Sequence, residues 1–300
     1  MKKIKTIILS ILVGLIAVNI NVYAQKNTPE KMEIGVSVAT GMSALNFVLV
    51  DGEKPSYGIG INFGWEAAFV FSEQLSFRTG VNLASFKSSV NIEQHNVCHQ
   101  LIPVPAGFPD DHKFSMIAEF GNYKEQFEAF YIRLPLMLQY LMGAKNNFYV
   151  SAGANVGIPL NSVSQINSEK LITKGYSDFT MQEYENMPNH GFYTYSDIRT
   201  GSKLQLGLSL SAALETGMKW KIRNGICLYT GLFADFGLNN IRKGDSMKES
   251  VIFNEESESF IFNSVLHSQT KDKPLIDKVK PMFFGLRLKI VFQDVLRNGK

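Results

Sequence analysis

Two short segments of this 300-residue chain carry side chains whose types and spacing suit chemistry. Residues 95–99 read HNVCH, which places two imidazoles and a thiol close enough together to bind a metal ion. Residues 110–112 read DDH, and acids beside a histidine could serve a hydrolase at which several loops meet. No second ligand cluster accompanies the first segment, and the second follows Pro109 as a polar turn does. We therefore interpret both as solvated loop segments, and we predict no catalytic residue, no cofactor and no metal.

Other reactive patterns are missing from the sequence. It has no Ser-centred elbow, no phosphate-binding loop and no zinc signature. Its two cysteines, Cys98 and Cys227, are too few for a disulfide framework. The five histidines all fall between the strands predicted below. The informative feature is therefore the pattern of the strands that would position any site.

The chain is dominated by long segments that alternate apolar with polar or small residues. Residues 204–220, LQLGLSLSAALETGMKW, keep this alternation for seventeen residues, whereas an ordinary strand has about 5–6. A strand whose apolar side faces lipid is longer, because a tilted strand needs about 9–11 residues to cross the hydrocarbon. Seven further segments share the pattern: 33–47, 57–71, 75–91, 127–142, 148–160, 226–238 and 279–293.

The connections between these eight segments alternate in length. Short turns follow the second, fourth and sixth segments, which is typical of a transmembrane β-barrel with short periplasmic turns and long extracellular loops. Because backbone groups in hydrocarbon must pair internally, the sheet has to close. We predict an all-β fold, an eight-stranded antiparallel up-and-down transmembrane β-barrel, with both termini in the periplasm. Its extracellular loops are expected at about 47–56, 92–126, 161–203 and 242–278.

The N-terminus has the features of a secretory signal peptide. Three lysines precede a twelve-residue apolar run, and the sequence VYA before Gln25 fits a cleavage site. Residues 1–24 are thus predicted to be the signal, and 25–300 the barrel. Removing three of the thirty basic residues leaves 27 basic residues against 27 acidic ones. A neutral mature chain gives no support for a nucleic-acid partner.

The polar face of the strands carries charged residues that a barrel would enclose. Unpaired charges in so narrow a space would each cost several kcal/mol, so we expect a salt-bridge network that plugs the barrel. A gated ion path or a proton relay is the functional alternative, although an eight-stranded interior has little more than room for side chains. Pro135 lies in mid-strand and cannot donate a ladder hydrogen bond, which predicts a bulge or a locally opened pairing. The eight charged residues are Glu66, Arg78, Arg133, Glu215, Lys219, Asp235, Arg287 and Lys289.

The predicted extracellular loops are rich in aromatic residues. Six rings and charges of both signs lie between positions 162 and 203. Such a surface could bind a protein or glycan partner. The alternative is a rim that packs on itself and caps the barrel.

Residues 130–158 read FYIRLPLMLQYLMGAKNNFYVSAGANVGI. This stretch resembles the PorT-like family of outer-membrane β-barrel proteins of Gram-negative bacteria, and the closing FFGLRLKIVF is similar to that family's ending. For the founding member, the resemblance implies a role in moving proteins across the outer membrane by the type IX secretion route. This chain departs from the pattern in its long loops and in eight residues, 293–300, after the last aromatic strand position. The matching motif positions are Tyr131, Leu134, Pro135, Leu136, Tyr140, Phe148, Tyr149 and Gly153.

The function that follows is that of an outer-membrane scaffold or accessory without catalysis, which engages partners through its extracellular loops. The resemblance adds a link to protein secretion. The expected partners are outer-membrane lipid, the barrel assembly machinery during biogenesis, and a protein or glycan at the loops. Two alternatives remain open: a barrel-rim hydrolase acting on lipid or peptide substrates, and a narrow small-solute channel.

Overall fold

A computed structural model describes residues 31–49, 52–103, 113–143, 147–223, 225–243, 248–254, 256–270 and 273–293. The predicted signal peptide and the segment 110–112 lie outside these residues. Residues Met32–Lys300 form one compact unit. The helices in the described part of the chain are two 3-10 turns, η1 (Pro188–His190) and η2 (Val265–His267). No helix there is long and apolar enough to cross a membrane.

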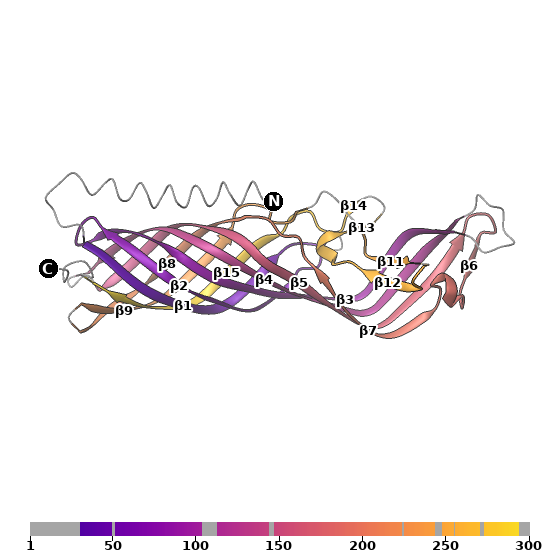
Figure 1. Cartoon of the computed structure of the whole chain (residues 1–300), viewed down its shortest axis with the longest axis horizontal. Helices are drawn as coiled ribbons and strands as arrows, with labels where there is room; N and C mark the ends of the chain where they lie inside the picture. Colours follow the sequence, from indigo (N-terminus) through magenta and orange to yellow (C-terminus); the bar gives the residue numbers. More distant parts are fainter. Residues whose placement is uncertain are drawn as a thin grey trace. The chain divides into compact units, whose positions relative to one another are not determined.

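The main sheet is built from antiparallel pairings. Following the neighbours from β1 leads through β2, β3, β4, β5, β8, β9 and β15 and back to β1, because β4 pairs with both β3 and β5 (Figure 1). We call these eight strands the ring. The prediction of an all-β fold with mostly antiparallel strands is confirmed. The ring strands are β1 (Lys31–Asn46), β2 (Ser56–Val70), β3 (Leu75–Pro103), β4 (Lys113–Met142), β5 (Phe148–Ser177), β8 (Ser209–Arg223), β9 (Ile226–Gly237) and β15 (Lys280–Phe292).

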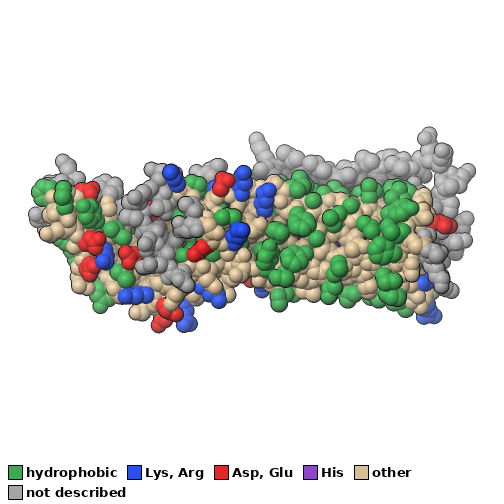
Figure 2. All heavy atoms as spheres, turned by 180° about the vertical axis from the view of Figure 1, so that it is seen from behind, with side chains coloured by type: hydrophobic (Ala, Val, Ile, Leu, Met, Phe, Trp, Pro, Cys, Tyr) green, Lys and Arg blue, Asp and Glu red, His purple; other side chains and the backbone are tan. Residues whose placement is uncertain are grey.

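The outward face of the ring is apolar, and its inward face carries the polar residues. On β4, for example, Leu136 and Leu138 are exposed, whereas Arg133 and Gln139 are buried. Figure 2 shows the exposed apolar side chains as a broad band over this part of the molecule. The period of two in the sequence produces both faces, because successive side chains of a strand point to opposite sides.

Three strands continue well beyond the ring and form a second structure, which we call the arm. β3, β4 and β5 have 29, 30 and 30 residues, and their outer halves pair with one another and with β6 (Gln182–Tyr184) and β7 (Thr194–Lys203). Segments 92–126 and 161–203, which the sequence interpretation assigned to loops, are thus mostly strands. The outer half of β4 alternates with period two as the ring does, but with the apolar side inward.

The reversal of polarity is clear along β4. In the ring, β4 buries Arg133 and exposes Phe130, whereas in the arm it buries Phe127 and exposes Lys124 and Gln126. The alternation is continuous along β4, but near Phe130 the apolar residues change from the outward face in the ring to the inward face in the arm.

The boundary also corrects the segment predicted at 204–220. Leu204 and Leu206 are buried in the core that the arm shares with the upper ring, whereas Leu208 and Leu210 are exposed, and β8 begins at Ser209. The even-numbered residues are mostly apolar along the whole segment, but they face inward before residue 208 and outward from residue 208 on.

Short elements between β9 and β15 cover the inside of the arm. Leu266 and Val265 of η2 and Phe253 of β11 are buried there against rings of the arm strands. Segment 242–278, expected as a loop, therefore supplies part of a core. Its strands are β10 (Lys248–Glu249), β11 (Val251–Asn254), β12 (Ser259–Phe262), β13 (Ser268–Thr270) and β14 (Lys273–Pro274).

Pro135 opens the ladder on one side. The β3–β4 pairs Thr79↔Leu136 and Asn82↔Arg133 are present, and the two pairs between them are absent from the ladder. On the other side Pro135 stays paired with Asn155 of β5. The prediction of a locally opened pairing is confirmed, and its cause is the N–H that proline lacks.

Candidate functional site

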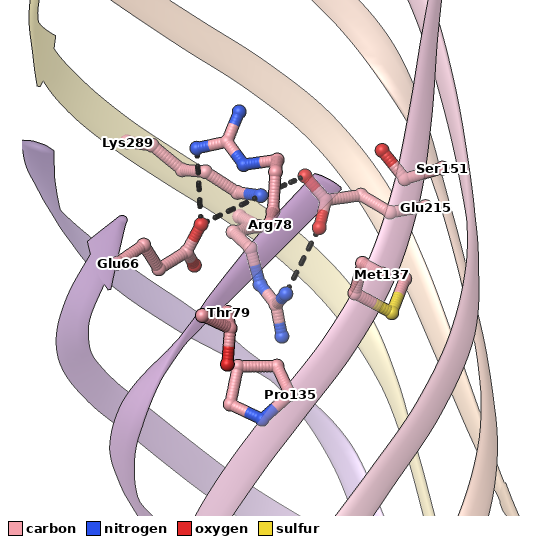
Figure 3. A pocket seen from close by; sticks show the side chains of 9 residues that line it. Glu66, Arg78, Thr79, Pro135, Met137, Ser151, Glu215 and Lys289 are labelled. Atoms are coloured by element: carbon pink, nitrogen blue, oxygen red, sulfur yellow. Dashed lines mark hydrogen bonds and ion pairs between the residues drawn. The ribbon is translucent and has the colours of Figure 1, made fainter. Parts of the chain in front are cut away.

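The interior of the ring holds a cluster of five charges from four strands (Figure 3). Lys289 Nζ lies 3.2 Å from Glu66 Oε2 and 2.8 Å from Glu215 Oε1. Arg78 binds the same Glu66 oxygen at 3.0 Å, and Arg287 binds Glu215 Oε2 at 2.9 Å. Each of the five side chains is at most 7% exposed. Each carboxylate therefore accepts from two cations, and Lys289 joins the two carboxylates.

A separate buried pair lies on β4 and β9. Arg133 Nη1 donates to Asp235 Oδ2 at 2.8 Å, and the other carboxylate oxygen accepts from Asn155 Nδ2 at 2.9 Å. Both charges are buried and hydrogen-bonded, which offsets much of their desolvation cost.

The eighth predicted charge, Lys219, is less enclosed. Its Nζ lies 3.9 Å from Glu33 Oε1 and 5.5 Å from the centroid of the Tyr229 ring. Glu33 also accepts from Gln293 Nε2 at 2.6 Å. The sequence interpretation missed Glu33, although its alternation with Ile34 placed it on the inward face of the first strand.

Neutral polar side chains complete the network, and these were also missed. Gln139 accepts from Arg78 Nη1 at 2.7 Å, and Tyr149 donates its hydroxyl hydrogen to Glu215 Oε1 at 2.7 Å. Tyr149 and Gln139 alternate with apolar outward residues on their strands, which is the signal that could have identified them.

The space left inside the network is small. The void among the five central charges has a volume of about 10 Å³, enough for about one water molecule. Toward the arm, Phe86, Phe233 and Phe283 pack with ring centroids 4.8 and 5.8 Å apart. Arg287 lies 4.6 Å from the centroid of Phe233. The described interior thus holds an ion cluster at one level and packed aromatic rings at the next.

The segment 95–99 lies on a strand, and the segment 110–112 lies outside the described residues. In the described part of the chain, no group of three or more His, Cys, Asp and Glu side chains could hold a metal. His95 and Cys98 lie on β3, paired with Phe120 and Ile117 of β4. Cys227 is a buried free thiol.

The motif positions divide between the two faces of the ring. Tyr131 and Tyr149 are buried inside, whereas Leu136, Tyr140 and Phe148 are exposed outside; Leu134 is half-buried, and Pro135 is buried. At Gly153 an added Cβ would lie 2.0 Å from the Leu136 carbonyl oxygen, so the close approach of β5 to β4 requires glycine. The motif therefore supports packing of the two strands.

Several solved structures of outer-membrane proteins are similar to this chain at low identity. Neisserial surface protein A is 9% identical, with 87% of this chain and 96% of that chain covered and a TM-score of 0.33. The attachment invasion locus protein of Yersinia pestis is 9% identical, with coverages of 88% and 99% and a TM-score of 0.30. The outer membrane protease OmpT from Escherichia coli is 9% identical, with coverages of 90% and 99% and a TM-score of 0.29.

Likenesses this distant transfer no activity, and no curated protein matches the sequence. The family comparison is broader and covers most of the chain. Residues 23–243 match the family described as outer membrane protein beta-barrel domain. The apolar outward face, the closed path of strands and the enclosed charges agree with that match, and the chain belongs to this family of outer-membrane β-barrel domains.

Proposed function

We propose that the ring crosses the outer membrane of a Gram-negative bacterium as a closed, eight-stranded, up-and-down barrel, and that the protein is a non-catalytic scaffold. In this proposal lipid covers the apolar outward face, the termini lie in the periplasm, and the arm projects outside the cell. Partners of the scaffold, protein or glycan, bind the arm.

The filled interior is the observation that carries this proposal. A channel needs a continuous path for water, whereas here the central void holds about one water molecule and three phenylalanines pack toward the arm. The arm supplies an ordered surface outside the apolar band, packed on the core of aromatic and aliphatic residues that it shares with the ring.

The resemblance to PorT-like proteins suggests where such a scaffold works. A role beside the machinery that moves proteins across the outer membrane fits an arm with a buried hydrophobic core. The motif that carries the resemblance lies on β4 and β5, the strands that continue from the ring into the arm.

Two measurements test the proposal. The full chain in planar bilayers should give no unitary conductance; steps of conductance would contradict the plugged interior. A photo-crosslinking residue at position 126, on the exposed face of the arm, should give protein or glycan adducts in cells. The same residue at 136, on the apolar band, is the control and should give lipid adducts. Absence of adducts at 126 would contradict the scaffold.

A further inference from the structure

An open groove of about 370 Å³ lies on the outward face of the arm, across β4, β5 and β7. Its volume falls within the range of about 300–1,000 Å³ that is usual for small-molecule sites. Its lining is polar: amides, a hydroxyl and charges of both signs, with Ile198 as the apolar residue. This composition suits a polar ligand of small size.

Two cations stand on either side of the groove. Lys124 and Arg199 are both register partners of Asn167, from β4 and from β7. Neighbouring strands lie about 4.8 Å apart, so the two Cα atoms are separated by about 10 Å. Both side chains are exposed, and within the described residues neither forms a salt bridge. By contrast, Lys87 Nζ of the neighbouring β3 is 2.9 Å from Glu128 Oε1 of β4.

At one end of the groove, the ladder pairing of β5 with β4 and with β7 is interrupted at the same level. The β4–β5 ladder has no pairs between Gly121↔Lys170 and Lys124↔Asn167. Asn122 and Asp197, which line the groove, have φ values of 50° and 52°. Non-glycine residues in this region are uncommon and gather at ligand sites more than elsewhere.

Acceptors accompany the cations in this part of the groove. Glu169 and Asp197 contribute carboxylates, and Glu169 Oε2 accepts from Asn122 Nδ2 at 2.7 Å. Carboxylates and amides hydrogen-bond hydroxyl groups, whereas lysine and arginine bind phosphate. A ligand that uses both must carry hydroxyls and an anionic group.

We infer that the groove binds a saccharide that carries phosphate, with the phosphate between Lys124 and Arg199 and the sugar hydroxyls on the amides and carboxylates. Lys124 is six residues, or about 20 Å along the strand, from Phe130, the exposed apolar ring residue of β4 that lies nearest the arm. Both the sugar of a membrane glycolipid and a free glycan reach this level. The inference rests on the proposed role of the arm as a binding surface, and it specifies the chemical class of the ligand.

The test uses the full-length protein in detergent and calorimetric titration with glucosamine 1-phosphate, glucosamine and inorganic phosphate. Glucosamine 1-phosphate should bind at least about tenfold more tightly than the other two probes. The double variant K124Q/R199Q should lose about tenfold or more in affinity, as expected when charge-assisted hydrogen bonds are removed. The matched control K221Q/R223Q removes two exposed cations of β8 and should bind as the wild type does.

Equal binding of inorganic phosphate and glucosamine 1-phosphate would overturn the inference, and so would unchanged binding by K124Q/R199Q. Heat-modifiable migration in gels shows that each variant is folded. Phosphoglycolipid retained by the purified wild type and lost from the variant would support a membrane source; equal retention with a loss of soluble binding would support a free glycan. If the bilayers show no conductance and position 126 gives adducts, but no saccharide binds, the saccharide site is ruled out and the proposed scaffold function still stands.

Discussion

Lys289 Nζ lies 2.8 Å from Glu215 Oε1 across the interior of the barrel, and both residues are less than 5% exposed. Lys289 also contacts Glu66, so replacing it with methionine leaves two buried carboxylates without the cation that joins them. Each carboxylate keeps one arginine, Arg78 or Arg287, but loses its bond to the lysine, and leaving a buried charged acceptor short of a partner costs about 1–3 kcal/mol. We expect Lys289→Met to lower the free energy of unfolding by that amount, measured by urea titration in liposomes with tryptophan fluorescence. The exposed Lys221→Met is the control, and equal midpoints for the two variants would contradict the network.

The exchange of polarity along β4 gives a second prediction. Leu136 and Gln126 lie on the same outward face of one strand, ten residues apart. If lipid covers the ring, Leu136→Arg should cost about 2–4 kcal/mol, the value for a cation near the bilayer midplane. Gln126→Arg should cost less than about 1 kcal/mol, because in our proposal the arm lies outside the bilayer. Urea unfolding from liposomes measures both. Similar costs at the two positions would mean that the apolar band does not face acyl chains.

The inward charges could be found from the sequence because each lies on the minor face of an alternating strand. Their partners could not. Arg133 and Asp235 are 102 residues apart, and their pairing depends on the relative register of strands that the sequence pattern leaves free. The opened ladder at Pro135 was predictable, since it follows from one missing N–H group.

The arm was hidden for a different reason. The alternation Phe114, Met116, Ala118, Phe120 was present in the sequence, but the lipid-facing pattern assigns the apolar side to the outside. In the arm the same alternation turns the apolar side inward. Periodicity indicates a strand, and it does not indicate which solvent the strand faces.

Glu125 gives a prediction of pH dependence in the arm. It is fully buried, and its Oε2 accepts from the Tyr123 hydroxyl at 2.7 Å and from the Val265 N–H at 3.0 Å, which ties η2 to β4. Burial raises the pKa of the Glu125 carboxyl above its usual 4.5. The folded arm therefore holds the proton more tightly than the unfolded chain does. Its stability is full below pH 4.5 and falls as the pH rises through the raised pKa.

Glu125→Gln keeps an acceptor for both hydrogen bonds and does not titrate. We expect the variant to hold η2 on β4 with equal protection at all pH values. Hydrogen-exchange protection factors of Val265 and Leu266 between pH 4 and 9 measure this difference. The wild type should lose protection toward the alkaline end; protection that follows the same curve in both proteins would rule out Glu125 as the titrating group.

His267, at the end of η2, should respond in the opposite direction. Its Nε2 accepts the backbone N–H of Gln205 at 2.9 Å, which requires the neutral imidazole. Burial and the nearby cations Arg242 and Lys248 lower the pKa of His267 from 6.5 to about 4. The stabilisation is therefore complete above pH 6.5 and is lost as the pH falls toward about 4. His267→Gln retains the acceptor and should abolish this acid-induced opening, measured as protease cleavage within 242–278. His190→Gln, in η1, should open as the wild type does, and opening of His267→Gln at the wild-type pH would assign the acid response to another group.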